Sequence, residues 1–436
     1  MYPFSKITLT ASAFLIVACS NQGLIDTKQF DNRHLPSLYV KQAPVNKSSS
    51  LSLSSIHTRV TQNNPHLRAA KLKLTEIRGK IIQSGRPDNP SLEIGIGKSI
   101  PGSEGGMEVS FSQRFPITNR LFLEKRVTKQ ELLIVKEELK IAEQSLTSAA
   151  QLLAVEALTL RDQRSHINKQ ISALNTLATF IEDAAKRGEL SPLDATQTRL
   201  EIQTLKTQQQ KLKGEENLLL TKIKGYIGLS PNHPLKLVGS LPSRSIPSRS
   251  LILSNRPVYR AKLMEIEHAK SSILLEKSRR YDDIEASVTG SISREEDAPE
   301  GLETEGAVGF GIKIPLPLYN KNEGNIITAT AKAKRNKLEK IAIAADIRQQ
   351  AAREKQTMQA WVNQNQLITK QLLPMAEKNS TDLEKAYRNG QSDFTALLKS
   401  KTEVLKLQSQ LLENAQQFHL ARVRYFAALG QPNSTF

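Results

Sequence analysis

The chain of 436 residues is poor in cysteine and in aromatic residues: it has one Cys, one Trp, and 5% Phe, Trp and Tyr together. A lone cysteine cannot form an internal disulfide, so Cys19 must be free, bound to another molecule or modified. The seven histidines are scattered, with no His-x-x-x-His pair and no cysteine partner, which argues against a structural metal site. No nucleophile stands beside a general base. We therefore expect no catalysis, no cofactor and no metal.

Long apolar runs are also missing. Beyond the N-terminal segment, no stretch reaches the length of roughly 18 apolar residues that a membrane-spanning helix needs. If the chain crosses a bilayer, it does so with strands. The net charge of +18 could suit nucleic acid, but the basic residues are interspersed with Glu and Gln at helical spacing, without an aromatic-basic strip. We interpret them as solvated helix faces and expect no nucleic-acid partner.

The N-terminus has the form of an export signal. Lys6 supplies positive charge, residues 7–17 form a mostly apolar core, and Ile16-Val17-Ala18-Cys19 places small residues before the cysteine. This tetrapeptide resembles the lipobox of bacterial lipoproteins, which implies cleavage before Cys19 and acylation of its thiol, with palmitate as the expected chain. Because Ser20 rather than Asp follows, the resemblance also implies sorting to the outer membrane. We expect a signal peptide over 1–18 and a lipidated leader over 19–55.

Landmarks of the first half of the chain reappear in the second half at a nearly constant offset, so the chain is a duplication. They are Pro65-His66-Leu67-Arg68-Ala69 with Pro257-Val258-Tyr259-Arg260-Ala261, Phe115-Pro116-Ile117 with Ile314-Pro315-Leu316, Gly188 with Gly390, and Gly228 with Gly430. The halves are too long to be solenoid units, which repeat at roughly 20–50 residues. We expect a first repeat over 56–228, a linker over 229–253, a second repeat over 254–430 and a tail over 431–436.

Each half contains two segments in which apolar residues alternate with small or polar ones, which predicts strands. Their length of about ten residues and their alternation suit transmembrane barrel strands. Four strands cannot close a barrel, because the smallest single-chain barrels have about eight. Several copies of the chain must therefore share one barrel. The predicted strands cover 90–98, 107–115, 284–293 and 306–314, and an acidic loop over 294–305 separates the last two.

Very long helices follow the strands. Residues 119–187 lack Pro and Gly, and Leu132, Val135, Leu139, Ala142, Leu146, Ala149 and Leu153 form a heptad seam typical of a coiled coil. At about 1.5 Å per residue, this helix spans roughly 100 Å. The helices expected over 192–228 and 57–83 have about the same length when their lengths are added. In the second half, the helix expected over 320–389 likewise has about the same length as the helices expected over 392–430 and 256–281 together. Pro374 should kink or break this long helix. Such helices would form the wall of a tunnel.

On these features the chain resembles the outer membrane efflux family, the TolC-like proteins, over nearly all of its mature length. The run Ile314-Pro315-Leu316-Pro317-Leu318-Tyr319-Asn320 is most similar to the CzcC-like heavy-metal branch. The other matching motifs are the Pro-x-x-Arg-Ala starts, Phe115-Pro116-Ile117, Lys186-Arg187-Gly188-Glu189-Leu190-Ser191, Tyr387-Arg388-Asn389-Gly390-Gln391-Ser392 and the terminal Leu-Gly.

The resemblance implies a mainly α fold with a small β part. Three copies would share a twelve-stranded transmembrane β-barrel, continued by long coiled-coil helices that form a periplasmic α-barrel. The implied function is an exit duct in the outer membrane that passively conducts metal cations or drugs. The implied partners are two further copies, outer-membrane lipid, a periplasmic adaptor protein and an inner-membrane pump of the RND or a related type.

The resemblance also implies that the helix-turn-helix tips near Gly188 and Gly390 meet the adaptor. A tight turn between antiparallel helices needs a residue that tolerates positive φ, which glycine does. Alternatively, both glycines cap helices without touching a partner. In some relatives, acidic residues beyond the second glycine ring the closed pore, but 394–401 has no carboxylate here. The expected docking residues are Arg187, Gly188, Leu190, Ser191, Arg388, Asn389, Gly390, Ser392 and Asp393.

Two other functions remain open on sequence grounds. A type I protein secretion outlet uses the same fold, and only the metal-branch junction motif favours efflux over it. A coiled-coil structural lipoprotein of the periplasm would explain the helices and the lipobox. It would have no use for an amphipathic hairpin in each half, so the four alternating segments argue against it.

Overall fold

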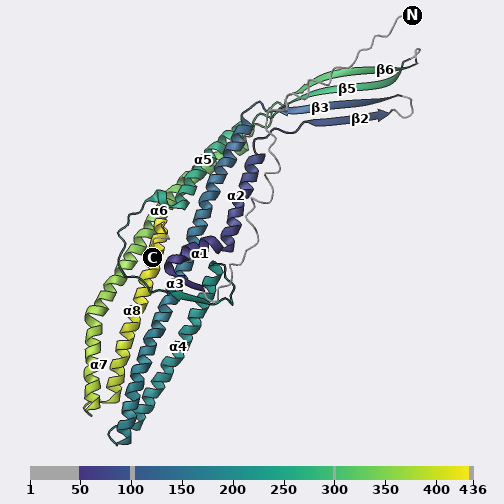
Figure 1. Cartoon of the computed structure of the whole chain (residues 1–436). Coiled ribbons are helices and arrows are strands. Elements are labelled where there is room, and N and C mark those ends of the chain that lie inside the picture. The colour runs from purple at the N-terminus through teal and green to yellow at the C-terminus, as the bar shows by residue number, and fades with distance from the viewer. Residues whose placement is uncertain (1–48, 99–103, 298–300, 432–436) are drawn as a thin grey trace. The chain divides into compact units, whose positions relative to one another are not determined.

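The computed structural model describes residues 49–98, 104–297 and 301–431, all within one compact unit, Asn46–Phe436 (Figure 1). The expected signal peptide, Cys19 and most of the leader lie outside the described residues. Within the described residues, the end of the leader contains a short strand and a one-turn helix, and the first repeat contains two helices, two strands and two long helices. They are β1 (Ser49–Ser52), η4 (Leu53–Ser55), α1 (Ile56–Asn63), α2 (Pro65–Gln83), β2 (Ser91–Lys98), β3 (Gly105–Phe115), α3 (Arg120–Lys186) and α4 (Pro192–Tyr226).

The second repeat follows the same order of short helix, two strands, long helix and medium helix, preceded by one strand in the linker. Its elements are β4 (Leu235–Val238), η5 (Leu253–Asn255), α5 (Pro257–Ser278), β5 (Ile284–Asp297), β6 (Gly301–Lys313), α6 (Glu323–Leu367), the π-helical turn η6 (Ile368–Leu372), α7 (Leu373–Arg388) and α8 (Phe394–Leu429). The sequence predicts a kink or break at Pro374. The chain stays helical there, but its hydrogen-bonding pattern changes to the π-helical turn η6 just before Pro374, which lies in the first turn of α7 and has no N–H to donate.

The four longer strands form one antiparallel sheet of order β2-β3-β5-β6. Its register places apolar residues opposite one another on one face, in rows such as Leu92–Phe111–Val288–Phe310. The other face carries small and polar rows such as Glu93–Ser110–Thr289–Gly309. The apolar face is uncovered in the single chain: Phe310 is 84% exposed. The predicted loop over 294–305 is wrong in extent, because β5 continues to Asp297 and β6 already begins at Gly301.

The helix expected over 57–83 is wrong, because it is two helices joined at Asn64. Pro65 has no N–H and pushes the preceding residue out of the helical region, and Asn64 has φ −64° and ψ 124°. Its buried side chain accepts hydrogen bonds from the backbone N–H groups of His66 and Leu67 (2.9 and 3.2 Å) and donates one to the Tyr226 carbonyl at the end of α4 (2.8 Å).

The second repeat contains the same joint. Arg256 also precedes a proline, and its guanidinium donates a hydrogen bond to the Ala427 carbonyl near the end of α8. Gly228 and Gly430 end the two partner helices with φ of 69° and 76°. A Cβ at either glycine would overlap a backbone carbonyl, that of Asn63 or that of Asn255. The duplication seen in the sequence is therefore preserved in the packing.

Alanine at these joint glycines should cost more stability than alanine at the turn glycines. Gly188 has φ 78°, but a Cβ added there would meet open space, so Gly188→Ala adds only the backbone strain, about 1 kcal/mol. Gly228→Ala and Gly430→Ala add a steric clash to the same strain. Thermal unfolding of the purified variants should rank both clearly below Gly188→Ala. Equal midpoints for all three would contradict the close packing of the joint.

The leader and the linker contain structure that the sequence does not predict. β1 pairs in parallel with β4 over Ser49–Ser52 and Leu235–Val238, and Leu51 and Leu237 are buried against the helices. Four residues are too few for an alternation to be recognised, and the pairing joins segments far apart in the chain. The extended leader expected up to residue 55 is therefore wrong from β1 onward.

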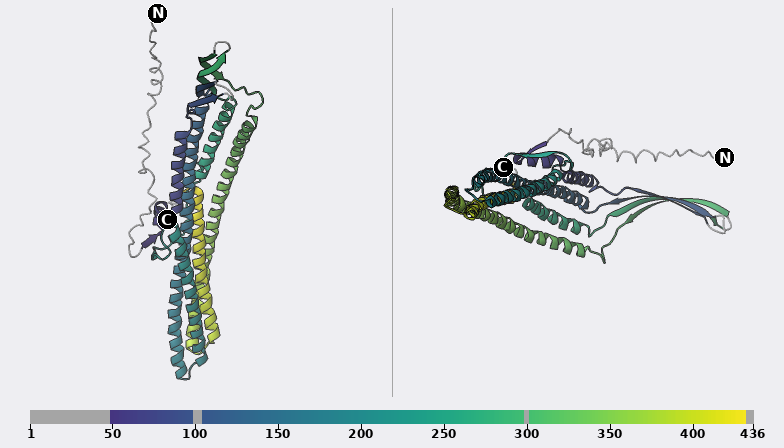
Figure 2. Two further views of the ribbon diagram at one scale, coloured as in Figure 1. Left: turned by 90° about the vertical axis from the view of Figure 1, so that its right-hand side faces the viewer. Right: turned by 90° about the horizontal axis from the view of Figure 1, so that it is seen from below.

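The long helices lie side by side, with α3 against α4 and α5, and α8 against α6, α7 and α3. The turn between α3 and α4 and the turn between α7 and α8 lie at the same end of the helices, and the four-stranded sheet follows the opposite end (Figures 1 and 2). Within the described ranges, no helix is both long and apolar enough to cross a membrane.

Candidate functional site

The two turns expected as docking tips have the same backbone geometry. In the first, Gly188 N–H donates to the Ala185 carbonyl (2.9 Å) and Glu189 N–H to the Ala184 carbonyl (3.0 Å). In the second, Gly390 N–H donates to the Tyr387 carbonyl (3.0 Å) and the next N–H to the Ala386 carbonyl (2.8 Å). This pair of bonds is the Schellman motif, which ends a helix on a residue of positive φ.

The predicted requirement for positive φ is confirmed, with values of 78° at Gly188 and 71° at Gly390. A Cβ at either position would meet nothing within 4 Å, so the backbone angle alone demands glycine. Both glycines are therefore helix caps in the described chain. Contact with a partner would come in addition to this role.

The other expected tip residues shape and cap the turns. Arg187 forms an ion pair with Glu189 (2.8 Å), and Leu190 packs against the apolar cluster below the turn. Ser191 caps α4 by accepting a hydrogen bond from the Leu193 N–H (3.2 Å). Asp393 caps α8 in the same way, through the Ala396 N–H (2.6 Å).

The remaining three lie on the second turn. Asn389 is the C-cap residue of α7, and its N–H donates to the Lys385 carbonyl (3.1 Å). Ser392 Oγ donates a long hydrogen bond to the Asp393 carbonyl (3.5 Å). Arg388 pairs with Glu384 one turn earlier (2.9 Å).

Two contacts across the turns join the halves, and we call them the tip clasp. The Tyr387 hydroxyl donates a hydrogen bond to Asp194 Oδ2 (2.7 Å), and the Arg388 guanidinium lies 4.3 Å from the Phe180 ring centroid. Burial and the bond to Asp194 raise the pKa of Tyr387, so its hydroxyl keeps its proton. The clasp thus holds the turn of the second repeat against the hairpin of the first.

Sequence reasoning missed the clasp. Tyr387 lies in a motif that the resemblance uses, but its partner Asp194 is far away in the chain and carries no motif of its own. The clasp rests on a buried cluster that both repeats share, with Ile181 and Ala195 from the first and Leu397 from the second. The signal that could have pointed to it is a tyrosine placed just before a helix-ending glycine.

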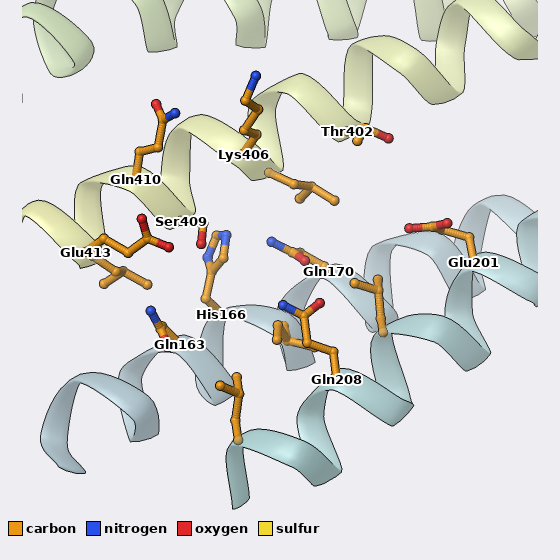
Figure 3. Close-up of a pocket in the computed structure, with 15 residues that line it drawn as sticks. Gln163, His166, Gln170, Glu201, Gln208, Thr402, Lys406, Ser409, Gln410 and Glu413 are labelled. Atoms are coloured by element: carbon orange, nitrogen blue, oxygen red, sulfur yellow. The ribbon is translucent and has the colours of Figure 1, made fainter. Parts of the chain in front are cut away.

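A cavity of about 550 Å³ lies beyond this cluster, between α3, α4 and α8 (Figure 3). Its wall is largely polar, and His166 points into its middle among amide and hydroxyl side chains. Burial lowers the pKa of His166, so the ring is neutral at pH 7. This cavity separates helices of the two repeats. At this end of the molecule, the buried cluster and the tip clasp therefore hold the α3–α4 pair against the α7–α8 pair.

The described residues include no group of three or more His, Cys, Asp or Glu side chains arranged to hold a metal ion. The expected lipidation residue, Cys19, lies outside them. The site that the structure offers is therefore the pair of clasped turns at one end and the uncovered apolar face of the sheet at the other.

No family model matches the sequence. The fold is that of solved outer membrane channels. A solved structure of CusC, whose report concerns folding and transmembrane channel formation, matches with a TM-score of 0.72 at 16% identity and covers 91% of this chain and 96% of CusC. The outer membrane protein VceC from Vibrio cholerae matches with a TM-score of 0.67 at 16% identity, covering 87% and 96%. At such identities the likeness establishes the fold alone.

A curated protein is also similar in sequence: the cobalt-zinc-cadmium resistance protein CzcC of Cupriavidus metallidurans is 24% identical over 248 residues. The matched region covers 56% of this chain and 54% of CzcC, so the chain spans about half the length of that relative. The resemblance to TolC-like efflux channels and to their CzcC-like branch, drawn from motifs, is confirmed by these comparisons.

Proposed function

We propose that this chain is the exit duct of a tripartite efflux system, a channel in the outer membrane that conducts substrate passively and has no catalytic activity. The observation that carries the proposal is the four-stranded sheet. One of its faces is apolar from edge to edge and uncovered, while the other is small and polar. A sheet in lipid presents such an outer face, and a water-filled lumen suits such an inner face.

The edges of the sheet support a trimer. β2 and β6 each pair on one side only within the described residues, which leaves a row of unpaired N–H and C=O groups on the other. Such groups are costly in lipid, so the sheet must close. Four strands are too few for one chain, and three copies give an even-numbered barrel of twelve. β6 of each copy would pair with β2 of the next, and Cys19 would add a lipid anchor in the same membrane.

The helices and turns support the remaining partners. The clasped turns lie at the end of the helices away from the sheet, where a periplasmic adaptor and its inner-membrane pump of the RND or a related type would engage the duct (Figure 1). Metal cations are the substrate class that we favour, because the curated relative is a cobalt-zinc-cadmium resistance protein. Drugs remain the second class.

The function is tested by deleting the gene and measuring survival on graded cobalt, zinc, cadmium and drugs. We expect greater sensitivity in the deletion strain and rescue by the intact chain. Loss of secreted protein with unchanged sensitivity would instead identify a type I secretion outlet. Unchanged sensitivity and secretion, with a monomer in detergent, would indicate a structural lipoprotein.

Removing the Tyr387 hydroxyl should loosen the tip without unfolding the chain. Tyr387→Phe keeps the ring, which packs 5.9 Å from Phe394, but loses the hydrogen bond to a carboxylate, worth about 1.5–3 kcal/mol. Hydrogen exchange should speed up over 384–393. Tyr425→Phe is the matched control, since the Tyr425 hydroxyl donates a similar bond (2.7 Å) to the Arg249 carbonyl far from the tip. Equal exchange at the tip in both variants would show that the clasp does not hold it.

A further inference from the structure

The segment between β4 and η5 contains the same pentapeptide twice with one conservative change, Leu241-Pro242-Ser243-Arg244-Ser245 followed by Ile246-Pro247-Ser248-Arg249-Ser250. It forms neither helix nor strand, yet it is fixed to the helices. Its apolar residues Leu241, Ile246 and Leu251 pack against the core clusters. We call this segment the strap. It presents two arginines five positions apart in equivalent sequence settings.

The two arginines are used differently. Arg249 donates a hydrogen bond to Gln431 Oε1 (2.6 Å), and its guanidinium lies 5.8 Å from the Phe426 ring centroid. The Arg244 guanidinium has no hydrogen bond and no ion pair within the part of the chain that the structure describes. Because the pentapeptides are otherwise nearly identical, Arg249 shows what an arginine of the strap does when its role is structural. Arg244 makes neither kind of contact, although burial and then the nearby charges of Arg422 and Arg244 lower the pKa of the His419 ring on α8.

Arg244 lines a small cavity against the end of α6, of about 230 Å³, and also one wall of a larger cavity, of about 760 Å³, between the strap, α3 and α8. Lys370 lines the small cavity as well, and none of the residues that line the small cavity is acidic. At about 30 Å³ per water, the cavity can hold a small ion together with several waters. The other lining residues are Val362, Asn365, Gln366 and Thr369.

Asn365 is the second observation that points to a ligand. The residue is only 5% exposed, and both atoms of its side-chain amide, Nδ2 and Oδ1, lack a hydrogen-bond partner within the described residues. A buried amide left unpaired costs about 1–3 kcal/mol, so such a group calls for a partner that the chain does not supply. The π-helical turn η6 begins three residues later, and single π-helical turns often occur at functional sites.

We propose that this cavity binds a small oxyanion such as phosphate or sulfate. The Arg244 guanidinium offers paired N–H donors, Lys370 adds a second positive charge, and the Asn365 amide supplies a donor in the buried wall. Charge-assisted hydrogen bonds from such a set favour an oxyanion over a neutral ligand. A bound oxyanion would tie the strap to the α6–α7 junction. The site is separate from the clasped turns and from the sheet, so it does not depend on the proposed export function.

Binding can be measured on the full chain purified in detergent, by calorimetric titration with inorganic phosphate and with sulfate against chloride at matched ionic strength. We expect saturable binding of one oxyanion per copy and none of chloride. Arg244→Gln should weaken it by tenfold or more, on the order expected for one lost charge-assisted bond. Lys370→Gln, at an exposed position, gives a second reduction that does not risk the fold. Arg249→Gln is the matched control and should bind within about twofold of the wild type.

Asn365→Leu distinguishes a built oxyanion site from nonspecific attraction to a basic surface, because the substitution changes no charge. It should weaken oxyanion binding while leaving the ligand-free chain as stable as before or more stable, because an unpaired buried amide is replaced by an apolar group of similar shape. The proposal is overturned if the wild type shows no saturable binding. It is equally overturned if Arg244→Gln binds as the wild type does, or if Arg249→Gln loses as much affinity as Arg244→Gln.

Discussion

Phe310→Arg is expected to remove the assembled protein from the outer membrane. Phe310 lies in the apolar row Leu92–Phe111–Val288–Phe310 and is 84% exposed in the single chain. If this face meets lipid, an arginine there costs about 2–4 kcal/mol near the bilayer midplane, and each copy in the proposed trimer would add the same cost. The measurement is the amount of assembled protein in the outer-membrane fraction, and we expect it to fall to near background.

Thr289→Arg is the matched control for this experiment. Thr289 lies one residue beyond Val288 on the same strand but on the opposite, polar face, and its partner on β6 is Gly309, which leaves room for a long side chain. We expect Thr289→Arg to reach the membrane and assemble, since its guanidinium would point into water. If Phe310→Arg assembled as well as Thr289→Arg, the apolar face would not be facing lipid.

The double variant Gly188→Val and Gly390→Val should abolish export while the protein still assembles. Both glycines have positive φ, which a β-branched residue adopts only with a strain of about 1 kcal/mol or more at each turn. Neither valine would clash, because the space around both positions is open, so the long helices behind should tolerate the strain. If the turns bind the adaptor, as proposed, docking needs the geometry of the turn, whereas closure of the sheet at the other end does not.

Cross-linking to the adaptor and survival on metal should be followed together for this variant, with its level of assembly as the control. Alanine at both positions gives a graded comparison, with the same φ strain but a smaller side chain. Normal export by the valine double variant would mean that the turns serve only as helix caps, and it would move the adaptor contact elsewhere on the helices.

Most of the fold could be predicted from the sequence pattern that the two halves of the chain share. Alternation over 284–293 or 90–98 predicts strands because a sheet with one apolar face must alternate at every second residue. The glycines at the ends of α3 and α7 predict turns because few residues other than glycine adopt positive φ without strain. Both patterns depend only on residues that are neighbours in the chain, so they can be recognised from a single sequence.

The features that the sequence could not predict depend on contacts between distant segments. β1 is too short to show a pattern and exists because β4 pairs with it. The break at Asn64 could have been predicted from the sequence, because Pro65 follows it and disfavours a helical backbone at the residue before it. The Tyr387–Asp194 bond and the unpaired Asn365 depend on how helices pack against neighbouring segments. The spacing of residues within one helix does not reveal that packing.

Cysteine cross-linking between the two edge strands, β2 and β6, tests whether copies of the chain share one barrel. Glu93→Cys on β2 would be combined in turn with Ala307→Cys, Gly309→Cys or Gly311→Cys on β6. Each single variant would serve as a control for disulfides that involve the native Cys19. A disulfide forms only when the two Cα atoms approach to about 5.5 Å, so a pair within one open sheet cannot form it. We expect one register to give a ladder of monomer, dimer and trimer on non-reducing gels, ending at the trimer. Monomer alone in all three registers would contradict a barrel shared between copies.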